Sequence, residues 1–382
     1  MQVITRSRDM YIGNEDLEHL YTMGRFPIYC GVTDSPETED QFEDMEWMIS
    51  KGSGMVQLGK LLPPETLYSI SHNSSYGGIW KRHHEEFANF LHQYAGKDGV
   101  LEIGGGNGIL CSVYNKKYTG GNNWTIIEPS EVEIINGCSA HYIKEMWNGS
   151  MDLKGIKYDT LVHSHLMEHQ YELDKFMSDC RKVLKMGQRM VFSLPDIKHW
   201  LREKHLNTLF FEHTYLISDD YVEGMLGRYG FRILEKRAFG NGHSLFYAVE
   251  KTDSIMTDGL DYKKLYHSNK EEFFDFIRFY ENKVGQYNEG MKKCEKVYLF
   301  GGHIFSQMLI NFGLETDRIQ CILDNDPLKQ GRRLYGASFL VKSPQILCDE
   351  DKPVVILNAG AYSEEIKKDI IENINSRTVF WE

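Results

Sequence analysis

A glycine-rich segment is the part of the sequence whose residue types and spacing point most directly to chemistry. Residues 100–110 read VLEIGGGNGIL, so a short apolar run leads into Gly104, Gly106 and Gly108. Glycines there let the backbone turn sharply and approach a ligand closely. Glu102 precedes the first of them by two positions, where its carboxylate could bind an amine. The segment predicts a ligand-binding loop after a buried strand.

A second acid supports this interpretation. Glu128 ends the next apolar run, 20 residues after Gly108. An acid at that place can accept hydrogen bonds from both hydroxyls of a ribose. Dinucleotide and S-adenosylmethionine sites share the pattern, but a carboxylate beside the loop suits a cationic sulfonium ligand with a free amino group better than a pyrophosphate. We therefore predict an S-adenosylmethionine site that consists of Glu102, Gly104, Gly106, Asn107, Gly108, Glu128 and Pro129.

The surrounding residues predict the elements that must position this loop. Between residues 86 and 252, short apolar strands at 100–103, 125–127, 160–163 and 190–192 alternate with helical patterns at 87–94, 173–184 and 219–230. Two further strands, 232–236 and 245–249, are joined by a turn that contains Asn241 and Gly242. Alternating strands and helices predict a parallel sheet with helices on both faces, and the closing hairpin predicts one antiparallel strand at its edge.

The last third repeats this outline on a smaller scale. After a helix with apolar residues at 273, 276, 277, 280 and 284, strands are expected at 297–300, 319–323, 354–357 and 378–381. Gly301 and Gly302 follow the first of these strands and Asp324 ends the next, but Ser306 takes the place of a third glycine. We therefore expect a second α/β domain without a working dinucleotide site. Residues 1–85 have no regular pattern, and we interpret the acidic run at 34–48 as a solvated face.

Composition excludes several functions. The 382 residues carry a net charge of −12, whereas a nucleic-acid backbone needs a basic face. No run of 18 apolar residues and no secretory signal are present, so we expect no membrane span and a cytoplasmic location. The seven cysteines lie no closer than 27 residues apart, which predicts neither a disulfide framework nor a metal site.

The glycine loop, the acid of the second strand and YDTLVHSHLMEH (158–169) together resemble class I S-adenosylmethionine-dependent methyltransferases. The segments 56–68, 211–231, 297–313 and 322–336 are similar to the deoxysugar-nucleotide C-methyltransferases, from about residue 55 onward. This resemblance implies an α/β fold, with an N-terminal cap at 1–85, a class I Rossmann-like methyltransferase sheet with an antiparallel edge strand at 86–252, and a smaller Rossmann-like domain at 253–382.

The resemblance also implies functional residues. The family's Glu-His pair falls on Glu212 and His213, and its other histidine falls on His169. In that family a base removes the proton next to a 4-keto group, and we choose His213 because a histidine titrates near neutral pH. On the cofactor side the resemblance implies Trp147, His163 and Ser164. The chain departs from the family at Phe210, where a tyrosine is usual, and in the cap, where Cys30 is the only cysteine in place of a zinc-binding cluster.

These features predict methyl transfer from S-adenosylmethionine to a small-molecule substrate, a nucleotide-linked sugar, by C-methylation of a keto-deoxysugar through an enolate. The first alternative is O- or N-methylation of such a sugar or a related small molecule. The second alternative is that the protein is a non-catalytic nucleotide- or cofactor-binding module. The loop before the methyltransferase region is rich in Tyr, Ser, Asn and Gly, and we predict substrate contacts from Tyr68, His72, Asn73 and Tyr76. Arg82 is a candidate for local recognition of an anion.

Overall fold

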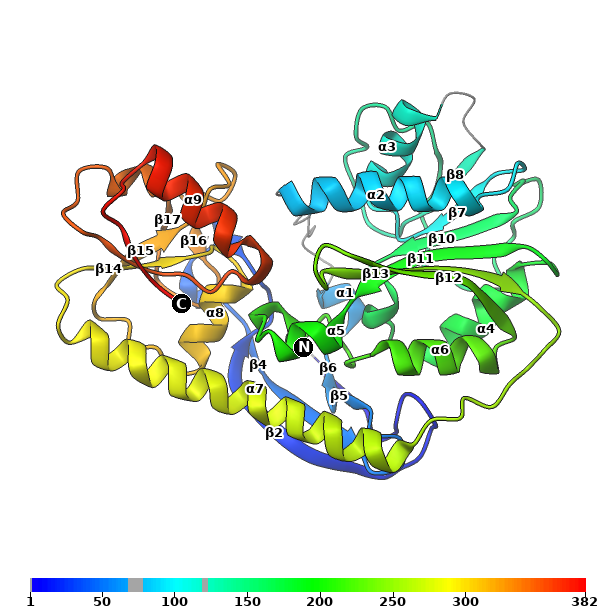
Figure 1. Ribbon diagram of the computed structural model, residues 1–382, viewed down its shortest axis with the longest axis horizontal. Helices are drawn as coiled ribbons and strands as arrows, with labels where there is room; N and C mark the ends of the chain where they lie inside the picture. Colours follow the sequence, from blue (N-terminus) through cyan, green and yellow to red (C-terminus); the bar gives the residue numbers. More distant parts are fainter. Residues whose placement is uncertain (1, 68–77, 119–122) are drawn as a thin grey trace.

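The computed structural model describes residues 2–67, 78–118 and 123–382. Figure 1 shows two lobes, each built on its own sheet, with the methyltransferase-like sheet in one and residues after 297 in the other. The long helix α7 (Tyr262–Met291) runs along both lobes, beside a ribbon of N-terminal strands. The predicted substrate residues Tyr68, His72, Asn73 and Tyr76 lie outside the described residues.

The larger sheet has seven strands in the order β12-β13-β11-β10-β7-β8-β9. All neighbouring pairs are parallel except those of β13, which runs antiparallel to both β11 and β12. The closing hairpin therefore lies at the edge as predicted, with β12 outermost and the antiparallel strand one place inside. The strands are β7 (Val100–Ile103), β8 (Trp124–Ile127), β9 (His141–Ile143), β10 (Thr160–Ser164), β11 (Arg189–Pro195), β12 (Phe231–Phe239) and β13 (Ser244–Lys251).

Helices cover both faces of this sheet, because each strand alternates its apolar side chains between two separate cores. On one face Phe87, Phe90 and Leu91 of α2 (Gly78–Tyr94) join α3 (Ile109–Lys117) against Val100 and Ile126. On the other face α4 (Leu173–Val183) and α6 (Asp219–Arg228) pack on Leu101, Leu161 and Phe192. The predicted three-layer α/β architecture is confirmed (Figure 1).

The smaller sheet is entirely parallel, in the order β17-β15-β14-β18-β19. Its strands are β14 (Val297–Phe300), β15 (Ile319–Leu323), β17 (Val341–Lys342), β18 (Val354–Ile356) and β19 (Val379–Trp381), and its helices are α8 (Ile304–Asn311) and α9 (Ser363–Asn373). The loop after β14 is closed by internal bonds: Gly302 N–H donates to Asp324 Oδ2 at 2.9 Å and Ser306 Oγ donates to the carbonyl of Gly301 at 2.6 Å. The expectation that no dinucleotide site forms there remains a prediction.

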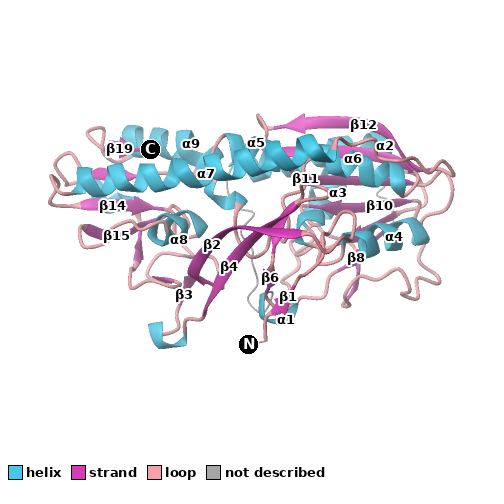
Figure 2. Ribbon diagram, turned by 90° about the horizontal axis from the view of Figure 1, so that it is seen from below, coloured by secondary structure: helices cyan, strands magenta, loops and turns pink. Residues whose placement is uncertain are grey.

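The N-terminal region is more regular than the sequence suggested. The strands β2 (Leu17–Pro27), β4 (Phe42–Ser50) and β5 (Val56–Leu58) form an antiparallel sheet that Figure 2 shows as a twisted ribbon beside α7. In β4, Met45, Trp47 and Ile49 are buried. Part of the acidic run thus lies on a strand, where Glu46 alternates with the buried Met45 and Trp47. The acids from Asp34 to Asp40 precede that strand, and the side chain of Asp40 is buried against Arg333.

Short elements tie the parts together. The strand β3 (Val32–Thr33) pairs with β16 (Arg333–Leu334), so the N-terminal region and the last third share a sheet. The other short elements are β1 (Ile4–Thr5), β6 (Lys60–Leu61), α1 (Pro64–Leu67), α5 (Ile197–Arg202) and 3-10 turns at Glu37–Glu39, Met167–His169, Leu206–Thr208, Pro344–Leu347 and Gly360–Tyr362. Among the residues placed here, no helix is long and apolar enough to cross a membrane.

Candidate active site

The glycine loop lies at the carboxyl end of β7, where an open parallel sheet binds its ligands. Gly104, Gly106 and Gly108 adopt φ angles of +67°, +52° and +81°, a region that favours glycine. A Cβ at Gly108 would lie 2.4 Å from Cys138 Sγ, whereas a Cβ at Gly106 would meet nothing within 4 Å. The loop therefore packs tightly on its inner side and leaves open space at Gly106 for a ligand.

Glu128 follows β8 and is fixed by two backbone amides. Its Oε2 accepts the N–H of Gly106 at 3.0 Å, and its Oε1 accepts the N–H of Ser130 at 3.0 Å. These bonds hold the carboxylate beside the glycine loop, where it retains lone pairs for the hydroxyls of a ribose. The two other predicted cofactor residues here, Asn107 and Pro129, flank this contact: the carbonyl of Asn107 accepts from the N–H of Ile135 at 2.9 Å, and Pro129 is exposed.

Glu102, which the sequence predicts to bind an amine of the cofactor, is buried. Its side chain lies under the loop, so that a Cβ at Gly105 would be 2.8 Å from its carboxyl carbon. Its Oε2 accepts the indole N–H of Trp124 at 2.7 Å, and burial raises its pKa to about 7. The structure thus places the Glu102 carboxylate beneath the glycine loop, and its binding to a cofactor amine remains a prediction.

The remaining predicted cofactor residues, His163, Ser164 and Trp147, lie in three different surroundings. His163 is fully buried in β10 between Phe176 and Phe192, 4.8 Å from the latter ring, because the odd-numbered residues of this strand face α4. Ser164, on the opposite face, exchanges a hydrogen bond with Ser193 at 2.7 Å. Trp147 is half-buried against the core on the α4 side. Of the three, Ser164 lies where β10 ends at the edge that carries the glycine loop.

A second group of side chains gathers on the turn after β10. Glu168 and His169 lie in the 3-10 turn Met167–His169, and His213 lies in the loop before α6. Backbone bonds join the two segments: Thr214 N–H donates to the carbonyl of Glu168 at 3.1 Å, and Thr214 Oγ1 donates to the carbonyl of Gln170 at 2.7 Å. One ligand-type atom of each of Glu168, His169 and His213 lies within 4.8 Å of the others. We call these three residues the histidine–carboxylate cluster.

Each histidine of the cluster uses one ring nitrogen to bond the backbone. His169 Nδ1 lies 2.8 Å from the carbonyl oxygen of Glu212, and His213 Nδ1 lies 2.9 Å from that of Thr208. A carbonyl can only accept, so each Nδ1 carries the proton and each Nε2 carries a lone pair in the neutral ring. Of the predicted pair Glu212 and His213, His213 therefore joins the cluster through its side chain. Glu212 supports the cluster through its backbone, because its carbonyl orients His169.

Burial dominates the electrostatics of the cluster. It raises the pKa of Glu168 to about 7, and together with the charge of His169 it lowers the pKa of His213 to about 3. Phe210, which stands where the family has a tyrosine, lies with its ring 4.3 Å from that of His213. The cluster is thus a largely dry, apolar-walled site in which proton positions are set by fixed partners.

The sequence did not point to Glu168, although it directly precedes His169. A further set of aromatic side chains was also missed as a group: His83, Trp80, His165 and His243 lie with ring centres between 4.9 and 6.0 Å apart. His165 connects this set to the cluster, because its Nδ1 lies 3.5 Å from Glu168 Oε1. The repeated histidines at 163, 165 and 169 were the available signal.

The glycine loop and the cluster are neighbours in space. A Cβ at Gly104 would lie 3.1 Å from Cδ1 of Leu166, two residues before Glu168. The end of β7 and the end of β10 therefore bring a ligand loop and a set of ionisable side chains to one edge of the sheet. This arrangement can hold a cofactor on the loop and present it to a second molecule beside the histidines.

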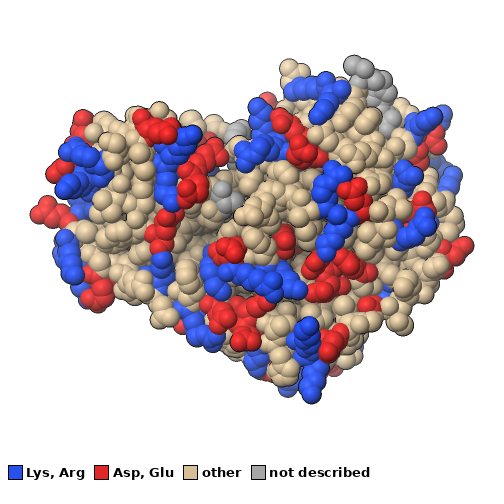
Figure 3. Space-filling model, in the orientation of Figure 1, with Lys and Arg blue, Asp and Glu red and all other residues tan. Residues whose placement is uncertain are grey.

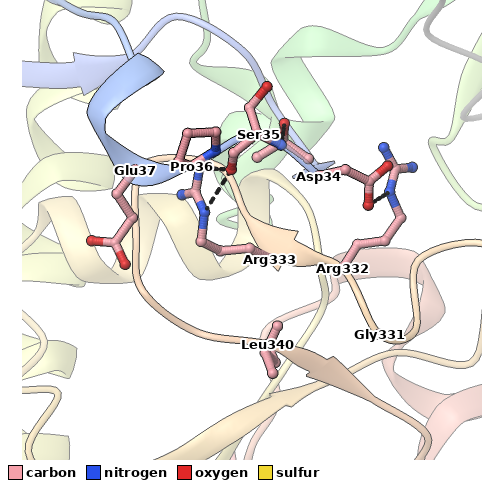
Figure 4. A pocket seen from close by; sticks show the side chains of 9 residues that line it. Asp34, Ser35, Pro36, Glu37, Gly331, Arg332, Arg333 and Leu340 are labelled. Carbon is pink, nitrogen blue, oxygen red and sulfur yellow. Dashed lines mark hydrogen bonds and ion pairs between the residues drawn. The ribbon is translucent and has the colours of Figure 1, made fainter.

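A separate cavity of about 440 Å³ opens where the N-terminal region meets the smaller lobe (Figure 4). Both arginines in its wall are paired: Arg333 makes two bonds to Asp40, of 2.6 and 2.8 Å, and Arg332 Nε lies 3.1 Å from Asp34 Oδ1. Figure 3 shows acidic and basic side chains interspersed over the visible face of both lobes. We place the chemistry at the sheet edge, where the ionisable side chains of Glu168, His169 and His213 lie together.

Comparison with known proteins identifies the larger sheet. Residues 79–236 match the family model of a methyltransferase domain. No curated protein matches the chain. With the strand order above, the match shows that the chain contains a methyltransferase domain with a class I sheet, and the predictions of that fold and of an enzyme are confirmed. S-adenosylmethionine is the methyl donor of this class of domain, in agreement with the predicted cofactor.

Solved structures resemble about half of the chain. The PH0226 protein from Pyrococcus horikoshii is 14% identical, and the alignment covers 49% of this chain and 99% of that one with a TM-score of 0.39. A 1,6-didemethyltoxoflavin-N1-methyltransferase from Burkholderia thailandensis, solved with 1,6-didemethyltoxoflavin and S-adenosylhomocysteine, is 14% identical over 52% and 96% of the chains, at a TM-score of 0.39. Magnesium protoporphyrin IX methyltransferase from Synechocystis, solved with S-adenosylhomocysteine, is 16% identical. The alignment covers 46% of this chain and 85% of that one, with a TM-score of 0.35. Similarities of this extent leave the substrate to be argued from the site.

Proposed function

We propose that this methyltransferase transfers the methyl group of S-adenosylmethionine to a nucleotide-linked sugar that lies beside the histidine–carboxylate cluster. The observation that carries the proposal is the proximity of the two halves of the site: a Cβ at Gly104 would lie 3.1 Å from Leu166, on the turn that holds Glu168 and His169. A methyl donor on the loop and an acceptor at the cluster are then adjacent. Methyl transfer needs this proximity, because the reacting atoms must meet in line.

The cofactor half has the groups that the donor requires. Glu128 is held at the loop by the N–H groups of Gly106 and Ser130 and can accept from ribose hydroxyls. Gly106 leaves space for the ligand. S-adenosylmethionine supplies a sulfonium methyl group, an electrophile that needs no further activation. The protein's own task is therefore to orient the donor and to activate the acceptor.

The cluster can activate an acceptor. Nε2 of His213 carries a lone pair, because Nδ1 is bonded to the carbonyl of Thr208. A base in this position can remove the proton next to a keto group, so that the resulting enolate attacks the methyl carbon. C-methylation of a keto-deoxysugar is the reaction that the resemblance of the sequence favours. We propose His213 as the base, with His169 and the Glu212 carbonyl as its neighbours in the site.

One observation favours the alternative of O- or N-methylation. The ring of Phe210 lies 4.3 Å from that of His213, at the place where the similar family has a tyrosine hydroxyl. Without that hydroxyl an enolate loses a hydrogen-bond donor, which removes stabilisation that enolate chemistry uses. A sugar hydroxyl or amine needs only a base and alignment with the methyl group. Arg82, exposed on α2, remains our candidate for the phosphates of the nucleotide, and a cytoplasmic location remains a prediction.

Incubation of the full-length protein with labelled S-adenosylmethionine and matched nucleotide-linked sugars tests the proposal. The panel pairs a 4-keto-deoxysugar with its 4-hydroxyl and 4-amino counterparts, so that one product identifies the acceptor atom. In D₂O, deuterium exchange next to the keto group in the absence of the donor reports enolate formation separately. Labelled product from any member supports the proposal. Binding of S-adenosylmethionine with no transfer to any member would contradict the nucleotide-sugar assignment.

A further inference from the structure

The histidine–carboxylate cluster has the geometry of a metal site as well as that of an acid–base site. Glu168 and His169 come from one turn, and His213 comes from a loop more than 40 residues later. His169 Nε2 lies 3.7 Å from Glu168 Oε1, and the three ligand-type atoms lie within 4.8 Å of one another. Two atoms bound to the same ion at bonds near 2.0–2.2 Å lie about 3–3.5 Å apart, so a small closure of this set would surround an ion.

The orientation of both imidazoles favours a metal. The Nδ1 atoms of His169 and His213 face the carbonyl oxygens of Glu212 and Thr208, at 2.8 and 2.9 Å. Histidines that bind metals almost always donate their other ring N–H to a carbonyl or carboxylate, which fixes the tautomer and turns the lone pair to the ion. Here this arrangement occurs twice, and it leaves the Nε2 lone pair of each imidazole available to an ion.

The carboxylate supplies the independent observation. Glu168 is fully buried, and neither of its oxygens has a hydrogen-bond partner within the described part of the chain. A buried polar group without a partner is costly, and a buried carboxylate is normally paired or bound to a metal. The nearest cationic candidates are the cluster histidine His169 and His165, whose Nδ1 lies 3.5 Å from Glu168 Oε1. No lysine or arginine is paired with Glu168 among those the structure places.

We propose that Glu168, His169 and His213 bind one divalent transition-metal ion, for which Zn²⁺ serves as the probe. Two imidazole nitrogens and one carboxylate oxygen suit Zn²⁺ and its first-row neighbours better than Mg²⁺ or Ca²⁺, which prefer oxygen ligands throughout. Three protein ligands also leave a coordination position open, as in catalytic zinc sites. The sequence-based expectation of no metal site rested on the cysteines alone. The ligands proposed here are two histidines and a glutamate, so this proposal replaces that expectation.

The position of the site gives the ion a role that rests on the proposed function. An ion at the cluster would hold an oxygen of the acceptor at its open position and polarise it, beside the glycine loop that holds the donor. His213 would then bind the ion through Nε2, and the proton of the acceptor would pass to the oxygen of Glu168 that the ion leaves free. Only the metal-free protein would use Nε2 of His213 as the base. His165, bonded through Nε2 to Ser244 Oγ at 2.9 Å, lies on the same side and helps to orient Glu168.

Calorimetric titration of chelator-treated full-length protein with Zn²⁺ tests the proposal, with three variants alongside. We expect one ion per chain for the unaltered protein. Glu168→Gln keeps the size of the side chain and removes its charge, and His213→Ala removes one nitrogen; each should weaken binding at least about 100-fold. His267→Ala, an exposed histidine on α7, is the matched control and should bind as the unaltered protein does. Circular dichroism verifies that each variant is folded.

The absence of one-to-one binding, or equal affinity in Glu168→Gln and the unaltered protein, would overturn the proposal. Should a variant fail to fold, the absorption spectrum of the Co²⁺-loaded unaltered protein decides the matter: intense d–d bands of a four- or five-coordinate ion support the site, and the weak spectrum of aqueous Co²⁺ contradicts it. Methyl transfer is measured separately. Transfer without metal binding refutes this inference and leaves the proposed function intact. Metal binding without transfer supports the metal site and contradicts the proposed function.

Discussion

The cofactor half and the acceptor half of the proposed active site meet at one sheet edge but are built in different ways. The cofactor half is formed by the backbone of consecutive glycines and by Glu128, which two amides hold in place. The acceptor half consists of buried side chains, Glu168, His169 and His213, brought together from two segments. The first half depends on local backbone conformation, and the second depends on the tertiary fold.

This difference has a consequence for mutational effects. Changes in the cofactor half should act mainly on the affinity for S-adenosylmethionine, because we propose that its groups contact the donor and not the acceptor. Changes in the cluster should act mainly on turnover, because its groups lie where the acceptor is expected. A cofactor-half variant that mainly lowers turnover, or a cluster variant that mainly weakens donor binding, would show that the two halves are not separate functional units.

The largest effect is expected at His213. Replacing His213 by Ala removes the Nε2 that faces the acceptor, as a base or as a metal ligand, and should lower kcat by roughly 10²–10⁴-fold. The dissociation constant for S-adenosylmethionine should change by less than about 2-fold, since the glycine loop is untouched. Single-turnover rates and calorimetry measure the two quantities. Retained turnover would remove His213 from the chemistry.

The next prediction concerns the buried Glu102 beneath the glycine loop and how the free energy of unfolding depends on pH. Its pKa is raised from 4.5 in the unfolded chain to about 7 by burial, so the folded protein binds the extra proton between these values. Its contribution to the free energy of unfolding is therefore greatest below pH 4.5 and falls as the pH rises to 7, by about 3 kcal/mol at most. In Glu102→Gln this slope should be absent.

The measurement for Glu102 is the difference between the denaturant unfolding free energies of the unaltered protein and the variant at several pH values. The difference isolates this carboxyl group from the other acids that titrate in the same range. A difference that stays constant from pH 4.5 to 7 would contradict a raised pKa for Glu102. It would favour the sequence-based prediction that the Glu102 carboxylate binds the amine of the donor.

At Glu128 we expect an effect on affinity alone. Glu128→Gln removes the charge that two backbone N–H groups and the ribose hydroxyls share, and hydrogen bonds to charged groups contribute about 1.5–3 kcal/mol each. The dissociation constant for S-adenosylmethionine should rise roughly 10-fold to 100-fold, with kcat at saturating donor within a few-fold. If kcat falls as far as in His213→Ala, the separation of the two halves fails.

The smallest effect is expected at Gly106. Gly106→Ala places a methyl group in the open space of the loop at φ +52°, and should weaken donor binding several-fold while costing about 1 kcal/mol of stability. Gly155→Ala is the control, since Gly155 has φ +85° and open space but lies far along the chain in an exposed turn. The control should share the loss in thermal stability and bind the donor normally. Weaker binding in both variants would point to a general effect of strain.

The sequence predicted the conformation of the glycine loop well because that conformation is local. A buried strand, glycines and an acid at the end of the next strand determine the loop within 29 residues, from Val100 to Glu128. The helices α2, α4 and α6 were likewise visible from their apolar spacing. The burial of Glu102 was not, because the indole of Trp124 that donates a hydrogen bond to it lies on another strand.

The acceptor half could be predicted only in part. His169 and His213 came from a resemblance, but the hydrogen bond that connects their segments spans 43 positions of the chain, and no local pattern encodes it. Glu168 was overlooked because a glutamate beside a histidine is unremarkable until both are buried together. His163 faces α4 because side chains alternate along β10, a rule that was available before the structure.

The same alternation explains the N-terminal sheet. Met45, Trp47 and Ile49 are spaced two apart among acids, which is the pattern of a strand with one buried face. The acidic composition obscured this pattern, and the region seemed irregular. In contrast, β9 has three residues and no buried side chain, so its sequence offered no comparable signal.

A crystal structure of the full-length protein with S-adenosylhomocysteine and the best acceptor of the panel tests the central claim most directly. We expect the ribose at Glu128 and the cofactor sulfur on the side of Leu166, with the acceptor atom between that sulfur and Nε2 of His213. A cofactor whose sulfur points away from Glu168, His169 and His213, or an acceptor bound elsewhere, would contradict the assignment of the sheet edge as the site of methyl transfer.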